Sequence, residues 1–369
     1  MELRAMIWNF YAWDAPFKIA FKHNSAERNQ AATVLIKLTH KGINAWGEAC
    51  PREYVTGESV DTCLAFLENF SATLMATSFD SFKDWLVFKN HWKDVLNANL
   101  AATCAIEMAI LDYLSKVNRC SVEQIIGATY SSGPFYYSAI IGDVKERIWD
   151  EQFAWHHDLQ LCDYKLKLNG EVAVDRLRIE KIVNAIPNAS IRLDANNKWE
   201  TVKEVQDYLD DLASPIFGLE EPLKHGSFKA LNELSKAIHT DIILDEHACR
   251  ITDLDQIDVP SRFILNLRVS KCGGVLNTIA MAEYAFEKGF RVIIGAQVGE
   301  SSLLTRAATL VVNAMSQPPI AQEGAYGTNL LEHDLVADIL QFDSKGVLFL
   351  PATSSSNGIG DVNWNESAL

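Results

Sequence analysis

Three acidic residues recur at nearly equal spacing, each directly after a short apolar run. Asp194 ends the segment IRLD, Glu220 ends FGLE and Asp245 ends IILD, at intervals of 26 and then 25 residues. That interval is the length of one β/α unit, so the three carboxylates would converge at the ends of successive strands. Such a cluster repels itself unless a cation lies in it, and oxygen ligands with open positions suit Mg²⁺, with Mn²⁺ as a substitute. For any one of these acids alone, a helix cap or a loop salt bridge is an equal alternative.

Two lysines lie one unit before the first acid, in the segment YKLK. Lys167 precedes Asp194 by 27 residues. Because strand side chains alternate, Lys165 and Lys167 share one face, while Tyr164 and Leu166 face the other way. Two lysines near each other and near a dication should both have lowered pKa values, and such a lysine can serve as a general base. The residues alone leave two alternatives open, an anion clamp and the Schiff-base lysine of an aldolase.

A further cationic side chain is expected one unit after the third acid, in the segment FILNLRVSK. Alternation puts Asn266, Arg268 and Ser270 on one face of this run, so Arg268 points inward. Lys271 follows the run, beside a Gly-Gly turn, where it would bind an anion or be solvated. The segment therefore predicts at least one positive charge opposite the two lysines.

These positions require a regular frame of strands and helices. From about residue 134, short β-branched and apolar runs alternate with amphipathic helical stretches. Eight such units fit a closed (β/α)8 barrel or a doubly wound sheet, and even spacing without a GxGxxG opening favours the barrel. The predicted strands are Tyr136–Ile141, Tyr164–Leu168, Ser190–Asp194, Phe217–Glu220, Ile242–Asp245, Phe263–Val269, Arg291–Gly295 and Ile320–Glu323. The clearest predicted helices between them are Val172–Ile186, Val202–Leu212 and Thr278–Lys288.

The first 120 residues have a different order, with strands first and helices afterwards, which indicates a separate α+β domain. The expected elements are strands at Met1–Ala12, Ala32–Thr39 and Ile43–Cys50 and helices at Val60–Met75 and Leu100–Val117. We therefore divide the chain into an N-terminal α+β capping domain (1–125), a barrel domain (126–335) and a C-terminal segment (336–369) that returns to the cap.

The composition is that of an ordinary globular protein. The 369 residues include 33 Lys and Arg against 48 Asp and Glu, a net charge of -15 without a basic run, which argues against binding to nucleic acid or anionic membranes. No signal peptide and no apolar run of about 18 residues is visible. The seven scattered cysteines form no CxxC pair. Reduced thiols in a cytoplasmic enzyme are expected.

Together these residues resemble the enolase superfamily, in particular its muconate lactonizing enzyme subgroup. The resemblance runs over nearly the whole chain and rests on the KxK pair, on Asp194 in LDAN, on Glu220 in LEEP and on Asp245 in LDEH. The segments CPREYVTGE at 50–58 and PATSSSNGIGDV at 351–362 also look like a substrate-covering loop and the returning C-terminal segment of that family. The fold implied is a modified, enolase-like TIM barrel with a capping domain.

The resemblance also implies a mechanism. A substrate carboxylate binds Mg²⁺, a base removes the α-proton, and the metal stabilises the enediolate. Lys167 would be the base or acid, and Lys165 would lower its pKa and hold the carboxylate. Glu246 is where the family often has an acid that orients the opposing lysine, and Asn196 of LDAN is a further candidate for binding or orienting the substrate.

One departure concerns the residue opposite Lys167. Members of the family with two bases carry a lysine on the sixth strand, where this chain has Arg268; Lys271 lies where the family often has a further lysine. Arginine has a pKa above about 12 and gives up a proton poorly. The favoured reading is therefore a cycloisomerase-like isomerase with one base. A racemase or epimerase of N-acyl amino acids or dipeptides, a hydroxy-acid dehydratase and a non-catalytic, metal-dependent binding protein remain alternatives.

Substrate contacts are expected from strand ends and from the cap. Glu300, after the seventh strand, and Glu323, at the end of the eighth, would bind the substrate or serve as helix caps or ion pairs. Two cap loops, Trp13–Asn29 and Cys50–Gly57, carry further candidates: Lys22, His23, Arg52 and Tyr54. The expected partner is a small carboxylate substrate, and barrels of this type commonly assemble as homo-oligomers.

Overall fold

The N-terminal part is built on a three-stranded antiparallel sheet in the order β1-β4-β5. The computed structural model describes residues 6–23, 26–224, 227–351 and 358–363, with the side chains of residues 19–28 outside that description. The strands are β1 (Ile7–Trp13), β4 (Thr33–His40) and β5 (Ile43–Ala49). The predicted first strand thus begins at Ile7 within the described residues, and Met1 to Ala5 lie outside them.

Helix α5 (Leu100–Asn118) joins the cap to the barrel. Every residue from Leu100 to Ser115 is buried. One face of α5, including Met108, packs into the large core shared with the barrel, and another, including Ile106, packs into the core of the cap. A Cβ at Gly47 of β5 would lie 2.0 Å from the carbonyl oxygen of Ala105, so this close approach of helix and sheet requires glycine.

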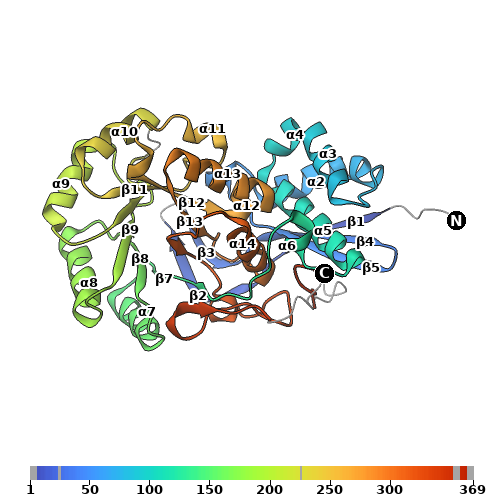
Figure 1. Cartoon of the computed structure of the whole chain (residues 1–369). Helices are drawn as coiled ribbons and strands as arrows, with labels where there is room; N and C mark the ends of the chain where they lie inside the picture. The colour runs from blue at the N-terminus through green and yellow to red at the C-terminus, as the bar shows by residue number, and fades with distance from the viewer. Residues whose placement is uncertain (1–5, 24–25, 225–226, 352–357, 364–369) are drawn as a thin grey trace.

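The other cap helices surround this sheet on the right of Figure 1. They are α1 (Glu53–Thr56), α2 (Val60–Met75), α3 (Phe82–His91), α4 (Lys93–Asn97) and α6 (Val122–Ile126). The segment predicted as the first cap loop is instead largely a hairpin of β2 (Pro16–His23) and β3 (Ala26–Gln30). Phe17, Ile19 and Phe21 alternate with Lys18, Ala20 and Lys22, so the sequence carried a strand signal here that the loop prediction overlooked.

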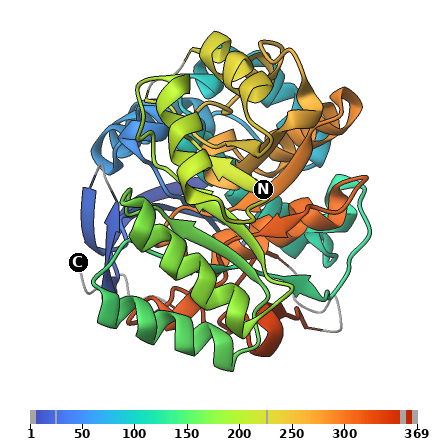
Figure 2. The same ribbon diagram turned by 90° about the vertical axis from the view of Figure 1, so that its left-hand side faces the viewer.

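The barrel consists of eight parallel strands in chain order, from β7 to β14. They are β7 (Ala139–Ile141), β8 (Asp163–Lys167), β9 (Ser190–Asp194), β10 (Gly218–Glu220), β11 (Asp241–Leu244), β12 (Phe263–Arg268), β13 (Arg291–Gly295) and β14 (Ala321–Gln322). The helices outside them, seen in Figure 2, are α7 (Glu146–Asp158), α8 (Val172–Ala185), α9 (Val202–Leu212), α10 (Phe228–Ala237), α11 (Ile251–Leu254), α13 (Val275–Lys288) and α14 (Ser302–Ala314). The predicted modified TIM barrel is confirmed.

Six of the eight predicted barrel strands have other bounds in the structure. The second, fourth and fifth differ by one residue at one or both ends, so Asp245 directly follows β11. The other three differ as follows. The first predicted strand is divided: β6 (Phe135–Tyr136) pairs with β15 (Val347–Leu348), and only β7 belongs to the barrel. The sixth strand ends at Arg268, because Val269 begins the short helix α12 (Val269–Cys272). The eighth is reduced to two residues, so Glu323 follows the strand.

The barrel closes at its base but separates toward the top between β7 and β14. The amide of Ser138 donates to the carbonyl oxygen of Gln322 at 2.8 Å. Two residues further on, the amide of Ile140 donates instead to the hydroxyl oxygen of Tyr326 at 2.9 Å. Gly324 (φ +106°) and Ala325 (φ +55°) turn the chain away from β7 between these two contacts. The carboxyl ends of the first and last strands are therefore not joined by a backbone ladder.

Residues 358–361 of the C-terminal segment lie against α5. The amide of Ile359 donates to the Asp112 carboxylate at 2.6 Å, and Lys116 lies 3.1 Å from the Asp361 carboxylate. Among the described helices, none is both long and apolar enough to span a membrane. All seven cysteines are free thiols.

Candidate active site

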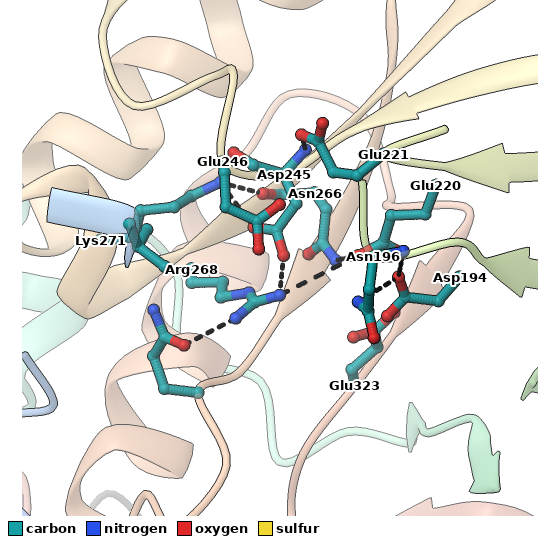
Figure 3. A network of polar contacts seen from close by, with 12 residues as sticks. Asp194, Asn196, Glu220, Glu221, Asp245, Glu246, Asn266, Arg268, Lys271 and Glu323 are labelled. Carbon is teal, nitrogen blue, oxygen red and sulfur yellow. Dashed lines mark hydrogen bonds and ion pairs between the residues drawn. The ribbon is translucent and has the colours of Figure 1, made fainter. Parts of the chain in front are cut away.

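The polar residues singled out in the sequence gather at the carboxyl ends of the barrel strands (Figure 3). They surround a small pocket of about 50 Å³. The residues that line it include Lys165 and Lys167 from β8, Arg268 from β12, and Tyr54 from the cap, together with Asp194, Asn196, Glu246 and Glu323. Five of the eight strands or their following loops thus contribute a charged group to one small volume.

Lys165 forms ion pairs with three carboxylates. Its Nζ lies 2.7 Å from Glu220 Oε1, 3.3 Å from Glu323 Oε2 and 3.5 Å from Asp194 Oδ2. Burial alone would lower the pKa of Lys165, but the charges of Glu220, Glu323 and Asp194 outweigh burial and raise this pKa. The expectation of a lowered pKa is wrong for Lys165, because the sequence did not reveal how many carboxylates surround it. The raised pKa keeps Lys165 charged at neutral pH.

Lys167 has the opposite character. Its Nζ donates to Asn196 Oδ1 at 2.9 Å and lies 3.7 Å from Asp194 Oδ2. Burial lowers the pKa of Lys167, and the positive charge of Lys165 acts in the same direction. The expected lowering is therefore confirmed here. Asn196, which has a positive φ of 46°, fixes the position of the ammonium group between itself and Asp194.

Arg268 and Lys271 both hold Asp245. Arg268 Nη2 is paired with Asp245 Oδ2 and lies 3.9 Å from Glu220 Oε1, while Nη1 donates to Gln297 Oε1 at 2.6 Å. Lys271 is fully buried and donates to the Asp245 carboxylate at 3.0 Å and to its carbonyl oxygen at 2.6 Å. Arg268 thus reaches the pocket, as alternation predicts. Lys271 is neither solvated nor among the pocket residues; it positions Asp245.

One carboxylate oxygen of the three strand-end acids has no hydrogen-bond partner among the described residues. Asp194, Glu220 and Asp245 are all buried, and Glu220 Oε2 has no hydrogen-bond partner among the described residues. Within the same residues no three acid, histidine or cysteine side chains stand close enough to hold a metal ion as they are. The reason is visible in the contacts: Lys165 and Arg268 lie between the carboxylates. Three buried carboxylates with a free oxygen fit a hard dication, which would take over charge that these two cations now neutralise.

Burial raises the pKa values of two further carboxyls, Glu246 and Glu300, toward or above neutral pH. Burial, followed by the charges of Glu221 and Asp194, raises the pKa of Glu246 to about 8. Burial raises the pKa of Glu300 to about 7, against the effect of the Gln297 amide that donates to its Oε1 at 2.7 Å. Glu246 lines the pocket, whereas Glu300 accepts from the Gln297 amide and lines a second, adjoining cavity. Glu300 was predicted to bind the substrate or to serve as a cap or ion pair. Its hydrogen bond from the Gln297 amide is the contact of a cap.

Glu323 forms ion pairs with Lys165 and Arg192. Arg192 Nη2 donates to Glu323 Oε1 at 3.0 Å, and its side chain is fully buried. Burial would raise the pKa of Glu323, but the charges of Lys165 and Arg192 lower it to about 2. Sequence reasoning missed Arg192, although the signal was present: it lies two residues before Asp194 on the same strand and therefore on the same face.

Sequence reasoning also missed Glu221 and His247, which contact each other. Glu221 accepts hydrogen bonds from the amides of Asp245 at 2.6 Å and His247 at 3.1 Å, and from His247 Nδ1 at 2.5 Å. Glu221 has a φ of +40°. It therefore fixes the loop that carries Asp245 and Glu246. The second acid of LEEP and the histidine of LDEH gave the only sequence signal for this pair.

Two of the cap candidates, Tyr54 and Arg52, have described side chains, and they make different contacts. Tyr54 lines the pocket and is 37 % exposed. Arg52 is buried, and its guanidinium donates to the carbonyl oxygens of Ala32 at 3.0 Å and Val298 at 2.6 Å. The expected substrate contact of Arg52 is therefore corrected: it ties the cap loop to the barrel. The side chains of Lys22 and His23 lie outside the described residues.

Comparison with known proteins gives two matching family models and many relatives. The model "Mandelate racemase / muconate lactonizing enzyme, N-terminal domain" matches residues 6–127, and "Enolase C-terminal domain-like" matches residues 153–360. The hydrophobic dipeptide epimerase of Citrifermentans bemidjiense is 25 % identical over 80 % of this chain and 82 % of its own length. The chloromuconate cycloisomerase of Cupriavidus pinatubonensis is 24 % identical over 86 % of this chain and 84 % of its own.

Solved structures give the same result for the fold. The dipeptide epimerase of Enterococcus faecalis V583, complexed with Mg and L-Leu-L-Tyr, superposes with a TM-score of 0.80 at 20 % identity, over 98 % of this chain and 99 % of that one. The likeness covers the cap as well as the barrel.

Proposed function

The chain belongs to the mandelate racemase / muconate lactonizing enzyme family of the enolase superfamily, and from that premise we propose a Mg²⁺-dependent isomerase of small carboxylates with one proton-transferring base. The observation that carries this proposal is a single small pocket lined by Lys167 and Arg268 and by the carboxylate of Asp194. Relatives named epimerases and cycloisomerases support the isomerase class.

Lys167 is the residue that removes the α-proton. It lines the pocket, and its lowered pKa leaves a larger neutral fraction near pH 7 than an ordinary lysine has. Asn196 holds its Nζ in place, so the amine is oriented before substrate binds. Lys165, charged and ion-paired, adds to the lowering of the pKa of Lys167 through its positive charge.

Asp194, Glu220 and Asp245 would hold the metal ion, and Mn²⁺ would substitute for Mg²⁺ because both prefer oxygen ligands. When bound, the ion supplies positive charge beside the substrate carboxylate, where negative charge develops as the α-proton leaves. Asn266, which donates to Glu220 Oε1 at 3.2 Å, and Lys271 keep two of these carboxylates in position.

Arg268 supports the charge of the substrate without exchanging a proton. Its guanidinium is anchored by Gln297 and Asp245, and arginine side chains give up a proton poorly. One base is enough for a cycloisomerase-type reaction, whereas inversion at the α-carbon needs a proton donor on the opposite face. This is the reason to rank a cycloisomerase-like reaction first.

A dipeptide or N-acyl amino acid epimerase is the second candidate. Six of the curated relatives carry epimerase names, and Glu246, protonated near neutral pH and lining the same pocket, is a group that can deliver a proton. This candidate requires a donor other than Arg268.

Isotope exchange separates the two candidates. The protein is incubated with Mg²⁺ in D₂O with dipeptides, N-acyl amino acids and unsaturated dicarboxylates, and products are followed by NMR and chiral chromatography. Deuterium in recovered substrate of unchanged configuration, or a lactonised product, supports one base. Deuterium found only in the inverted isomer supports the epimerase. Exchange that persists in Lys167→Met contradicts the assignment of the base.

We also infer a cytoplasmic homo-oligomer. The seven free thiols are compatible with a reducing compartment. Size-exclusion chromatography with light scattering measures the assembly directly, and a monomeric mass contradicts that part of the proposal.

A further inference from the structure

A second, larger cavity adjoins the catalytic pocket. Its volume is about 400 Å³, compared with about 50 Å³ for the pocket itself. Ile140, Ala296 and Val298 line both spaces, so the two are continuous. A volume of this size is within the range of complete small-molecule sites. The small pocket has room for a carboxylate and its α-carbon, and the cavity has room for a much larger group.

The cavity follows from the separation of β7 and β14. Above the Ser138–Gln322 hydrogen bond the two strands diverge, and the Tyr326 hydroxyl satisfies the amide of Ile140. Gly142 and Val144, which follow β7, form one wall, and Gly324 and Ala325, which follow β14, form another. In a fully laddered barrel these segments would be in contact, so the opening is a property of this chain's turn at Gly324 and Ala325.

The inner wall comes from helix α7. Ile148, Gln152, Trp155 and His156 line the cavity from this helix. His156 is buried, and burial lowers its pKa to about 4, so the wall is uncharged at neutral pH. The charged lining residues Lys18 and Glu151 are exposed to solvent, and a third, Glu300, is partly buried, with a pKa that burial raises to about 7. Apart from Glu300, the interior accepts apolar surface.

Two polar atoms in this wall, Gln152 Oε1 and His156 Nδ1, have no hydrogen-bond partner among the described residues. A buried acceptor such as Gln152 Oε1 is costly to leave unpaired, so it favours a ligand that brings a hydrogen-bond donor to it.

We propose that this cavity binds a bulky, uncharged and mostly apolar substituent of the substrate, and that Gln152 reads a hydroxyl or amide donor on it. The substrate class is then a carboxylate whose α-carbon carries an aryl-containing or long acyl group, rather than a small dicarboxylate. This inference rests on the proposed function for the position of the carboxylate.

The test is a graded ligand series measured by calorimetry with Mg²⁺: N-acetyl-, N-hexanoyl-, N-(3-phenylpropanoyl)- and N-[3-(4-hydroxyphenyl)propanoyl]-L-alanine. Affinity should rise about tenfold or more from the acetyl to the phenylpropanoyl compound, as expected for burial of a ring. The hydroxyphenyl compound should bind more tightly again, and Gln152→Met should remove that last increment alone.

Two filling variants and a control locate the effect. Ile148→Trp and Val144→Phe add bulk to the cavity wall and should lose about tenfold in affinity for the long compounds while keeping that for N-acetyl-L-alanine. Leu177→Trp, at a 66 % exposed position of α8, makes a comparable change away from the cavity and should alter neither. Equal affinities along the series, equal losses in all variants, or no binding of any compound would overturn the inference.

Exchange of the α-proton in the same samples distinguishes this inference from the proposed function. Exchange with affinities that do not depend on chain length overturns only the cavity. Graded affinities without any exchange in D₂O overturn only the reaction.

Discussion

Two sets of buried carboxylates in this protein differ in how completely they are satisfied. The first set is three of the buried carboxylates of the cap, Glu58, Glu107 and Asp112, called here the cap carboxylates, and the second is the strand-end carboxylates Asp194, Glu220 and Asp245. In the cap, each oxygen has a donor: Glu58 accepts the amides of Ala101 and Ala102, and Asp112 accepts those of Trp46 and Ile359 and the ammonium of Lys116. Glu107 likewise accepts from Trp85, Lys89 and the Leu276 amide.

The strand-end carboxylates share their cations and leave a lone pair unused. Lys165 serves Glu220, Glu323 and Asp194 at once, and Arg268 reaches both Asp245 and Glu220. Among the described residues, the buried carboxylate oxygens without a hydrogen-bond partner are Glu220 Oε2 and Glu246 Oε2, both at this site. Full satisfaction in the cap stabilises the fold, whereas incomplete satisfaction at the strand ends leaves capacity for a ligand.

The largest expected effect comes from replacing a lysine that lies beside each set of carboxylates. Lys167→Met should reduce α-proton exchange about 10²- to 10⁴-fold, the usual range for loss of a general base, with little change in unfolding free energy. In the wild type the rate should rise with pH through the lowered pKa of Lys167, because only the neutral amine accepts a proton.

Lys116→Met is the matched change in the cap. It removes the cation that lies 2.9 Å from Asp112 and 3.1 Å from Asp361, and it should lower stability while leaving exchange intact. Urea unfolding and NMR exchange on both variants check the pair. A Lys116→Met protein that is folded but inactive would contradict the division between the two sets.

The next contrast replaces one carboxylate in each set by its amide. Asp112→Asn should lower the free energy of unfolding by about 2 to 3 kcal/mol, because buried charge-assisted hydrogen bonds to two amides and Lys116 are weakened. Asp194→Asn should change stability by less than about 1 kcal/mol, since it relieves crowding among like charges as well as losing ion pairs. Chemical denaturation measures both, and equal losses would show that the strand-end carboxylates are structural too.

Metal binding is the third contrast. If Mg²⁺ binds the strand-end carboxylates, a concentration of 100 Kd should stabilise the wild type by about 2.7 kcal/mol and leave Asp194→Asn almost unaffected. Arg268→Met should bind Mg²⁺ about tenfold more tightly, because the guanidinium now paired with Asp245 no longer competes with the ion.

Arg268→Lys is the companion variant, since a lysine keeps the charge but can exchange a proton. It should gain epimerisation of substrates that the wild type only exchanges. Calorimetry with Mg²⁺ and chiral chromatography check the two variants. Unchanged metal affinity in Arg268→Met would mean that this ion pair does not oppose the metal.

The sequence was sufficient for everything that depends on periodicity. The family, the barrel and the isomerase class are confirmed, and alternation correctly put Lys167 and Arg268 on the inner face. Prediction from the sequence failed where a residue's pKa or burial depends on several neighbours at once. The pKa of Lys165 depends on carboxylates from three other strands or their following loops, and the burial of Arg52 depends on contacts of two loops 246 residues apart. The separation of β7 and β14 at Gly324 and Ala325 was missed because a turn with positive φ at an alanine leaves no reliable sequence signal.

The smallest expected effect concerns the carboxyl of Glu300, which belongs to neither set of carboxylates. Its pKa is raised from 4.5 to about 7 by burial, so between these values the folded chain holds a proton that the unfolded chain releases. The stability contributed by this protonated carboxyl is complete below pH 4.5 and is lost as pH rises through 7. The full shift would correspond to roughly 3 kcal/mol, and partial exposure of the side chain reduces this to about 1 to 2 kcal/mol. Glu300→Gln is neutral at every pH, so its unfolding free energy should fall less than that of the wild type between pH 5 and pH 8. Glu151→Gln, at an exposed position, should follow the wild type, and identical pH profiles for all three proteins would place the Glu300 carboxyl among the solvated acids.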